Sequence, residues 1–120
     1  MGGKLRARAH RRRAVVARPG RGDVWWLEDP DVGRRPALVL TRDAAIPVLT
    51  WLLAAPITRT VRSIPTEVPL DADDGMPEPC AVTLDNVRPV RPSLLTARIT
   101  TLGPERMQAV CDALRTAVAC

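Results

Sequence analysis

Short apolar runs separated by turn-forming residues occupy most of the chain after residue 22. Each run is either wholly apolar or alternates between apolar and polar positions, and Gly, Pro, Asp or Asn residues bound it, which is typical of β-strands. We predict six strands, at residues 23–27, 36–42, 48–58, 66–70, 80–90 and 97–102. The runs at 36–42 and 48–58 are almost entirely apolar, which indicates buried strands.

Two of the predicted strands alternate instead. Residues 66–70 are expected to form a half-buried edge strand, where Pro69 is tolerated because an edge position does not require its missing N–H group. In residues 80–90 the alternation predicts two opposite faces, with Ala81, Thr83 and Asp85 on one and Val82, Leu84 and Asn86 on the other.

The end of the chain has a different period. Pro104 and Glu105 suit the first turn of a helix, because that turn needs no N–H from proline and its N-terminus attracts an acid. Apolar residues then recur at helical spacing: Met107, Val110, Cys111, Leu114 and Val118. We predict an amphipathic helix of about three to four turns that covers the core. Short strands followed by one terminal helix predict a mainly β fold, a small, strongly curved barrel with a C-terminal helix.

Charge divides the chain into two regions. Residues 1–21 contain eight of the 18 Lys and Arg residues and no Asp or Glu, which leaves ten cations and thirteen anions in residues 22–120. We therefore expect residues 1–20 to form a basic, flexible N-terminal arm and residues 21–120 to form one folded domain. The sequence leaves two interpretations of the arm open: a solvated tail, or an arm that binds RNA phosphates.

The residue types argue against several other classes of protein. The three cysteines show no CxxC spacing and the single histidine, His10, lies in the arm, so we expect no disulfide framework, no metal site and no cofactor. Cys80 and Cys111 are expected in the core. No apolar run approaches the length of a membrane span, and the run AVVA is too short for a secretion signal. We expect a cytoplasmic protein without membrane contacts.

Arginine and threonine side chains gather at the ends of the predicted strands. Five such positions stand out: Arg35, Thr58, Arg59, Thr60 and Arg88. If the strands are neighbours, these side chains meet at one rim of the barrel, where the planar, permanently charged guanidinium groups suit a phosphate. Spacing alone leaves the alternative open, that these are ordinary strand-end residues held in surface ion pairs.

Five segments, taken in order, resemble the MazF/PemK family of bacterial toxin endoribonucleases. They are RGDVWWLEDP, GRRPALVLTRD, AAPITRT, IPTEVPL and AVTLDNVR, and the resemblance extends from Arg21 to about Ala119. It implies an SH3-like small β-barrel with a C-terminal helix that works as a homodimer. It also implies the toxin of a type II toxin–antitoxin system: a metal-independent endoribonuclease that cleaves single-stranded RNA at specific sequences and is neutralised by a cognate, MazE-like antitoxin.

The same resemblance assigns the candidate site. Its catalytic residues would be Arg35, directly before the proline, and Thr58, at the end of the next strand. The resemblance also matches Asp85 and Asn86 to a pair that contacts RNA in relatives. With the arginines near the strand ends, the candidate RNA-binding residues are Arg34, Arg59, Asp85, Asn86 and Arg88. One segment departs from the family: EDPDVGRRP is too short for the Ser-Glu-Gln run that many relatives carry before the Arg-Pro pair. An RNA contact made by that longer loop therefore does not transfer to this chain.

The implied chemistry uses the RNA's own 2′-hydroxyl as the nucleophile and leaves a 2′,3′-cyclic phosphate and a 5′-hydroxyl. Arg35 would stabilise the charge of the transition state, and Thr58 would hydrogen-bond a phosphoryl oxygen. Three tryptophans in a small aliphatic core predict that at least one of them lies at the homodimer interface or beside the RNA groove. Two other classes stay open: a non-catalytic SH3-like toxin that poisons a protein such as DNA gyrase, and a structural RNA-binding protein.

Overall fold

The computed structural model describes residues 18–120, so residues 1–17 of the predicted N-terminal arm lie outside the described residues. The described part contains short strands, single 3-10 turns and one long terminal helix. In chain order these are β1 (Asp23–Asp29), β2 (Gly33–Val39), η1 (Ile46–Val48), β3 (Leu52–Thr58), β4 (Glu67–Leu70), η2 (Ala72–Asp74), β5 (Cys80–Thr83), η3 (Leu84–Asn86), β6 (Arg88–Val90), η4 (Pro92–Leu94), β7 (Leu95–Thr101) and α2 (Pro104–Val118).

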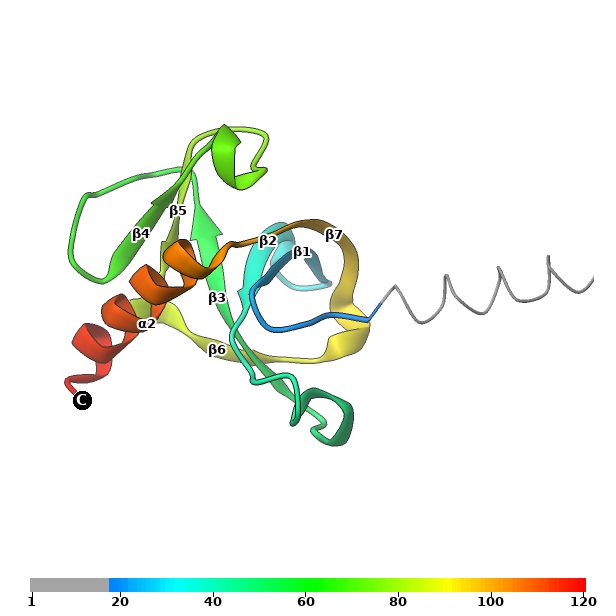
Figure 1. The fold of residues 1–120 in the computed structure, drawn as a ribbon. Coiled ribbons are helices and arrows are strands. Elements are labelled where there is room, and N and C mark those ends of the chain that lie inside the picture. The colour runs from blue at the N-terminus through cyan, green and yellow to red at the C-terminus, as the bar shows by residue number, and fades with distance from the viewer. Residues whose placement is uncertain (1–17) are drawn as a thin grey trace, which may run out of the picture.

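The strands form one curved antiparallel sheet with α2 packed against it (Figure 1). Their order is β4-β5-β3-β2-β1-β7, and β6 pairs with β3 beside β5. The predicted mainly β fold with a C-terminal helix is confirmed. The sheet curves like a small barrel. It does not close, because β4 and β7, the two ends of the strand order, do not pair with each other.

Strand β3 organises the sheet because three other strands pair with it. β2 lies along one edge, with Ala37 opposite Pro56. Along the other edge, β6 pairs with the first residues of β3 and β5 pairs with the last two, Ile57 and Thr58. The ends of β2, β3, β5 and β6 are thereby brought close together.

The single strand predicted for residues 80–90 is wrong. The chain pairs with the end of β3, bends through η3 and then pairs with the start of β3. Pro56, which has no N–H group to donate, lies in the stretch of β3 between these two ladders. The bend buries Leu84, which is 2% exposed, and leaves both Asp85 and Asn86 exposed instead of on opposite faces.

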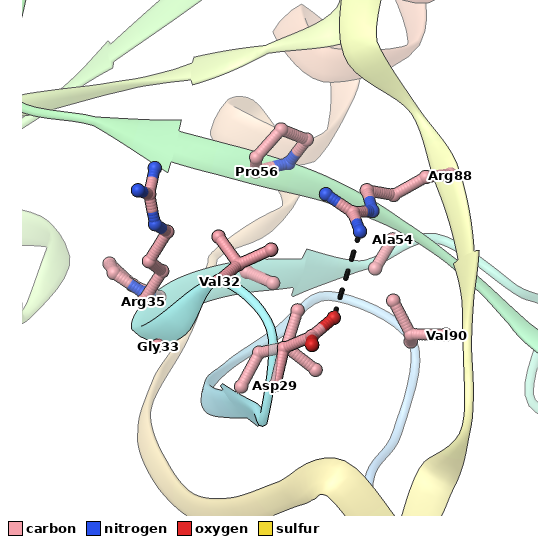
Figure 2. Close-up of a pocket in the computed structure, with 11 residues that line it drawn as sticks. Asp29, Val32, Gly33, Arg35, Ala54, Pro56, Arg88 and Val90 are labelled. Carbon is pink, nitrogen blue, oxygen red and sulfur yellow. Dashed lines mark ion pairs between the residues drawn. The ribbon is translucent and has the colours of Figure 1, made fainter.

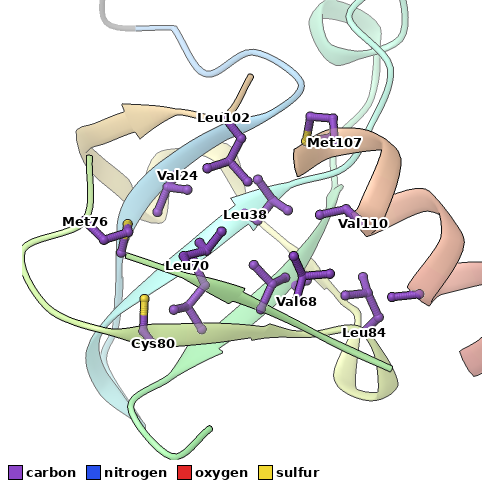
Figure 3. Close-up of a cluster of buried hydrophobic side chains, with 14 residues drawn as sticks. Val24, Leu38, Val68, Leu70, Met76, Cys80, Leu84, Leu102, Met107 and Val110 are labelled. Atoms are coloured by element: carbon purple, nitrogen blue, oxygen red, sulfur yellow. The ribbon is translucent and has the colours of Figure 1, made fainter. Parts of the chain in front are cut away.

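Two clusters of buried aliphatic side chains stabilise the sheet. The larger lies between the sheet and α2 and includes Val24, Leu38, Val82 and Leu84 (Figure 3). The smaller packs around Trp25 on the other side of the β1–β2 hairpin. The central strand residues are fully buried in these clusters, so the strand ends that carry polar side chains rest on a rigid base.

The helix buries a slightly different face from the predicted one. Met107, Val110 and Ala113 are its buried residues, and Met107 and Val110 point into the larger cluster in Figure 3. Cys111 is only half-buried, so its predicted core position is wrong, whereas Cys80 is buried as predicted.

The strand predicted for residues 48–58 begins later than expected. Pro47 lies in the 3-10 helix η1, and β3 starts only at Leu52. This connection leaves four large apolar side chains exposed, a surface called here the β3 apolar patch: Val48, Leu49, Trp51 and Leu53. The guanidinium of Arg91 lies 4.5 Å from the ring centroid of Trp51.

Candidate active site

A groove of about 900 Å³ lies where the ends of β2, β3 and β5 meet η3. All seven residues predicted from the sequence line it: Arg34, Arg35, Thr58, Arg59, Asp85, Asn86 and Arg88. The topology explains this convergence, since β3 carries β2 on one edge and β5 and β6 on the other. Residues from four separate segments of the chain therefore share one solvent-filled site.

Arg35 stands at the mouth of the groove, in front of a buried strand. It pairs across the β1–β2 hairpin with Leu27, and the next residue, Pro36, is half-buried. Proline fixes its own φ angle and restricts the residue before it to extended backbone. The following residues Ala37 and Leu38 are 2% and 0% exposed, so the base of the Arg35 side chain is held rigidly.

Arg35 also differs from the other groove arginines in its pairing. Each of the other four has a carboxylate partner: Arg34 with Glu28 at 3.5 Å, Arg59 with Glu78 at 3.5 Å, Arg62 with Glu67 at 2.6 Å, and Arg88 with Asp29 at 3.8 Å. Among residues 18–120, Arg35 makes no ion pair and no side-chain hydrogen bond. Among the described residues, Arg35 is therefore the groove arginine whose guanidinium has no carboxylate partner.

Thr58 ends β3, opposite Ala81 of β5, and its side chain is half-buried in the groove. Its Oγ1 accepts the backbone N–H of Thr60 at 3.1 Å. This local bond uses a lone pair of the oxygen and orients the side chain. The hydroxyl proton is left to donate to an oxygen in the groove.

The neighbours Asp85 and Asn86 are exposed on η3, and each is held by a threonine. Asp85 accepts the hydroxyl of Thr66 at 2.6 Å, and the Asn86 side chain donates to Oγ1 of Thr83 at 3.1 Å. The 3-10 turn is what places both side chains in the groove, because a continuous strand would have turned one of them away. Both keep further hydrogen-bonding capacity toward a ligand.

One wall of the groove carries a stacked pair that the sequence did not reveal. The guanidinium of Arg34 lies 4.3 Å from the ring centroid of Trp26, and both residues line the groove. Glu28 pairs with Arg34 and also accepts the hydroxyl of Thr96 at 2.7 Å. Thr96 on β7, Glu28 on β1 and Arg34 on β2 thus form a row of contacts that holds the guanidinium over the indole. Trp26 is the tryptophan that lies beside the groove.

A small cavity lies beside the β1–β2 turn, as Figure 2 shows. Asp29 at the end of β1 reaches Arg88 on β6 at 3.8 Å. Val32 and Pro56 line the same small cavity, whose volume of about 20 Å³ holds little more than one water molecule. Arg35 also lines this cavity.

A family model described as the PemK-like, MazF-like toxin of type II toxin–antitoxin systems matches residues 20–118. The chain belongs to this family. A curated relative of this MazF-like chain, the probable endoribonuclease MazF5 of Mycobacterium tuberculosis, is 47% identical over 107 residues, which are 88% of this chain and 98% of the relative.

Solved structures of other MazF proteins have the same fold. The Mycobacterium tuberculosis toxin MazF-mt6 superimposes with a TM-score of 0.74 at 34% identity, over 81% of this chain and 96% of that one. An endoribonuclease in complex with its cognate antitoxin, from a mycobacterial species, gives a TM-score of 0.76 at 28% identity, over 84% of this chain and 95% of that one. The SH3-like architecture implied by the resemblance is therefore confirmed.

The charge of the groove is opposite to that of the surrounding domain. Five arginines line the groove of this MazF-like chain, against two acids, Glu78 and Asp85. Residues 22–120 as a whole carry ten cations and thirteen anions. The positive potential is therefore local to the groove, where it attracts an anion and leaves the rest of the domain mildly repulsive to one.

The remaining chemistry of the site is limited. Burial, with a smaller contribution from Asp74 and Glu78, raises the pKa of the Cys80 thiol, so this groove-lining cysteine is a poor nucleophile. Within residues 18–120 no three His, Cys, Asp or Glu side chains lie close enough together to hold a metal ion. In the same part of the chain, no helix has the length and apolarity to cross a membrane.

Proposed function

We propose that the chain is the toxin of a type II toxin–antitoxin system and that its groove cleaves single-stranded RNA. The observation that carries this proposal is the pairing of an unengaged, rigidly held Arg35 with the hydroxyl of Thr58 in one positively charged groove. Membership of the MazF-like toxin family and a curated relative named as an endoribonuclease support it.

The proposed reaction needs no nucleophile from the protein. The 2′-hydroxyl of the RNA gives its proton to water and attacks the adjacent phosphorus, the bond from phosphorus to the 5′-oxygen breaks, and that oxygen takes a proton from water. The products are a 2′,3′-cyclic phosphate and a 5′-hydroxyl. The protein has to align these atoms and stabilise the extra negative charge of the transition state.

Arg35 and Thr58 supply this stabilisation. The guanidinium offers a planar fork of N–H donors and a charge that is never lost, and the strand behind it fixes its position. A preorganised donor of this kind contributes about 3–4 kcal/mol, or roughly 10²- to 10³-fold in rate. The Thr58 hydroxyl donates to a second phosphoryl oxygen, because its oxygen is already oriented by the Thr60 N–H.

The other groove residues bind the flanking nucleotides. Arg34, Arg59 and Arg88 contact phosphates or bases, and each has to exchange a carboxylate partner for the RNA. Asp85 and Asn86 offer an acceptor and an amide to base edges, which is how an unpaired strand is recognised by sequence. The short β1–β2 turn contributes Val32 to this surface.

Two assemblies belong to the proposal. The β3 apolar patch is the surface that we assign to a homodimer, because four exposed apolar side chains around an arginine-stacked tryptophan have the composition of an interface centre. A MazE-like antitoxin is the inhibitor that we expect to occupy the groove, since a relative of the same fold is described in complex with its cognate antitoxin. We propose that the protein acts in the cytoplasm, because its proposed substrate, RNA, is found there.

The rival function, a non-catalytic toxin that poisons a protein such as DNA gyrase, lacks support from the groove, because a protein-binding surface has no use for the Arg35–Thr58 pair. The experiment that separates the two uses the purified chain with single-stranded RNA in EDTA. Fragments that carry 2′,3′-cyclic phosphate and 5′-hydroxyl ends are the expected result. Intact RNA after prolonged incubation would refute the proposed activity.

A further inference from the structure

One carboxylate beside the groove is buried, and both of its oxygens contact the same residue. The side chain of Glu67, at the start of β4, is 3% exposed. Its Oε2 accepts a hydrogen bond from NH1 of Arg62 at 2.6 Å, and its Oε1 accepts the backbone N–H of Arg62 at 3.0 Å. An ionised carboxylate is unfavourable away from water unless such partners compensate it, so the contact holds Arg62 firmly.

This contact lies in the wide loop between β3 and β4, and further hydrogen bonds hold the same part of the loop (Figure 1). The backbone N–H of Glu67 donates to the carbonyl of Ile64 at 3.0 Å, and Ser63, directly before Ile64, has a φ of 56°. Thr66 ties the end of the loop to η3 through Asp85. A neutral acceptor at residue 67 would close the same turn, so the negative charge serves only the guanidinium.

The guanidinium of Arg62 faces the groove and is largely unengaged. The Arg62 side chain is 54% exposed and lines the groove together with Arg35 and Thr58. Among residues 18–120, the bond from NH1 to Glu67 is its only side-chain hydrogen bond. The remaining N–H groups of the fork are therefore available to a ligand, and the fork is already oriented.

Arg59, in the same loop, is by contrast not held in a fixed position. Its side chain is 82% exposed, and its partner Glu78 is 53% exposed at 3.5 Å. A pair of this kind contributes little and exchanges freely with solvent. Arg62 differs from it because its partner is buried and cannot move away.

We propose that Arg62, positioned by the buried Glu67, is a further phosphate-binding residue of the groove. Its ligand is a backbone phosphate of the single-stranded RNA that crosses Arg35 and Thr58, and the inference rests on the proposed function. A fixed, permanently charged fork suits a phosphodiester, which carries its charge on two oxygens. Because Arg35 comes from β2 and Arg62 from the β3–β4 loop, the RNA is held from two separate elements.

The test measures binding of a 2′-fluoro RNA oligonucleotide pool, which lacks the nucleophile and is not cleaved, across a salt series. Arg62→Ala should weaken binding roughly 10- to 100-fold at low salt, as expected for hydrogen bonds to a charged group. Its log–log salt slope should fall by about 0.7, the value for one lost phosphate contact on a single strand. Arg62→Lys should keep the slope and recover only part of the affinity.

Two more variants separate positioning from general charge. Glu67→Gln keeps an acceptor for the backbone N–H and keeps the Arg62 charge, so binding should weaken several-fold with an unchanged slope. Arg115→Ala removes the same charge from an exposed pair with Asp112 on α2, outside the groove, and should bind within about twofold of the wild-type chain. Thermal unfolding of each variant shows whether its fold is intact, and Arg62→Ala and Arg62→Lys decide the question if Glu67→Gln unfolds.

If Arg62→Ala binds RNA with the wild-type affinity and salt slope, the inference is overturned. The Arg62–Glu67 pair would then serve only to close the loop. Cleavage of unmodified RNA in EDTA is measured alongside. A wild-type chain that cleaves, with Arg62→Ala unaffected in binding, refutes only the role of Arg62. A wild-type chain that neither cleaves nor binds RNA refutes the proposed function and this inference together.

Discussion

Replacing Arg34 by lysine should weaken RNA binding while leaving the fold nearly unchanged. The guanidinium lies 4.3 Å from the ring centroid of Trp26, and its Nε lies 3.5 Å from Glu28. The side chains of Arg34 and Glu28 are 55% and 49% exposed, so their ion pair contributes at most about 1 kcal/mol to stability. An exposed cation–π contact adds about 0.5–1 kcal/mol, part of which lysine retains. We expect the free energy of unfolding to fall by about 1 kcal/mol at most.

The effect on RNA should be larger. A guanidinium that lies over an indole offers a planar group on which an unpaired base can stack, and lysine has no such plane. Stacking contributes about 1–3 kcal/mol per base, which corresponds to about 5- to 150-fold in the dissociation constant. Arg34→Ala should lose the stack and one charge, so its salt slope should also fall by about 0.7.

The assay is fluorescence anisotropy of a labelled 2′-fluoro RNA oligonucleotide, with thermal unfolding of every variant. Arg98→Lys is the matched control, because Arg98 is exposed on β7 and does not line the groove. Wild-type affinity in Arg34→Lys, together with a loss in Arg34→Ala, would show that Arg34 contributes only its charge. That result would refute the stacking role of Trp26 and Arg34.

Two further predictions concern titratable groups beside the sheet. Burial raises the pKa of Asp74, but the hydrogen bond from Arg106 at 2.9 Å and backbone bonds outweigh it, so the net pKa is lowered. This stabilises the fold above the unfolded pKa of about 4 and is lost as the pH falls through the lower folded value. Arg106→Ala should therefore lower the Tm at pH 7 and progressively less below about pH 4; an equal loss at every pH would contradict the ion pair. At pH 8, iodoacetamide should modify the exposed Cys120 and spare the buried Cys80, whose pKa is raised, and peptide mass mapping checks this.

The sequence predicted which polar side chains gather in one groove better than it predicted the elements around them. The apolar runs that become β2 and β3 end in polar side chains, and the antiparallel pairing of neighbouring strands brings Arg35 and Thr58 to one groove. The ordered family motifs placed both residues without any knowledge of the pairing. Local patterns were sufficient here because Arg35 and Thr58 each flank an apolar run, at residues 36–40 and 51–57.

Other features depend on contacts between distant segments and leave no local signal. The alternation of residues 80–90 continues through η3, and only the second ladder on β3 and the burial of Leu84 break the strand. Glu67 follows the polar spacing of an edge strand, yet its buried position is explained by Arg62. Likewise, the stack of Arg34 on Trp26 requires the hairpin register, which the sequence does not display.

The most direct test of the central claim is the rate at which Arg35 variants cleave RNA under saturating substrate. Arg35→Ala should lower the rate by roughly 10²- to 10³-fold. Arg35→Lys should also fail to restore it, because a point charge does not reproduce the planar fork. Arg115→Ala, which removes an exposed charge from α2, should cleave at the wild-type rate. Near wild-type cleavage by Arg35→Ala, in a protein that is folded and binds RNA, would contradict the account and place the reaction elsewhere on the molecule.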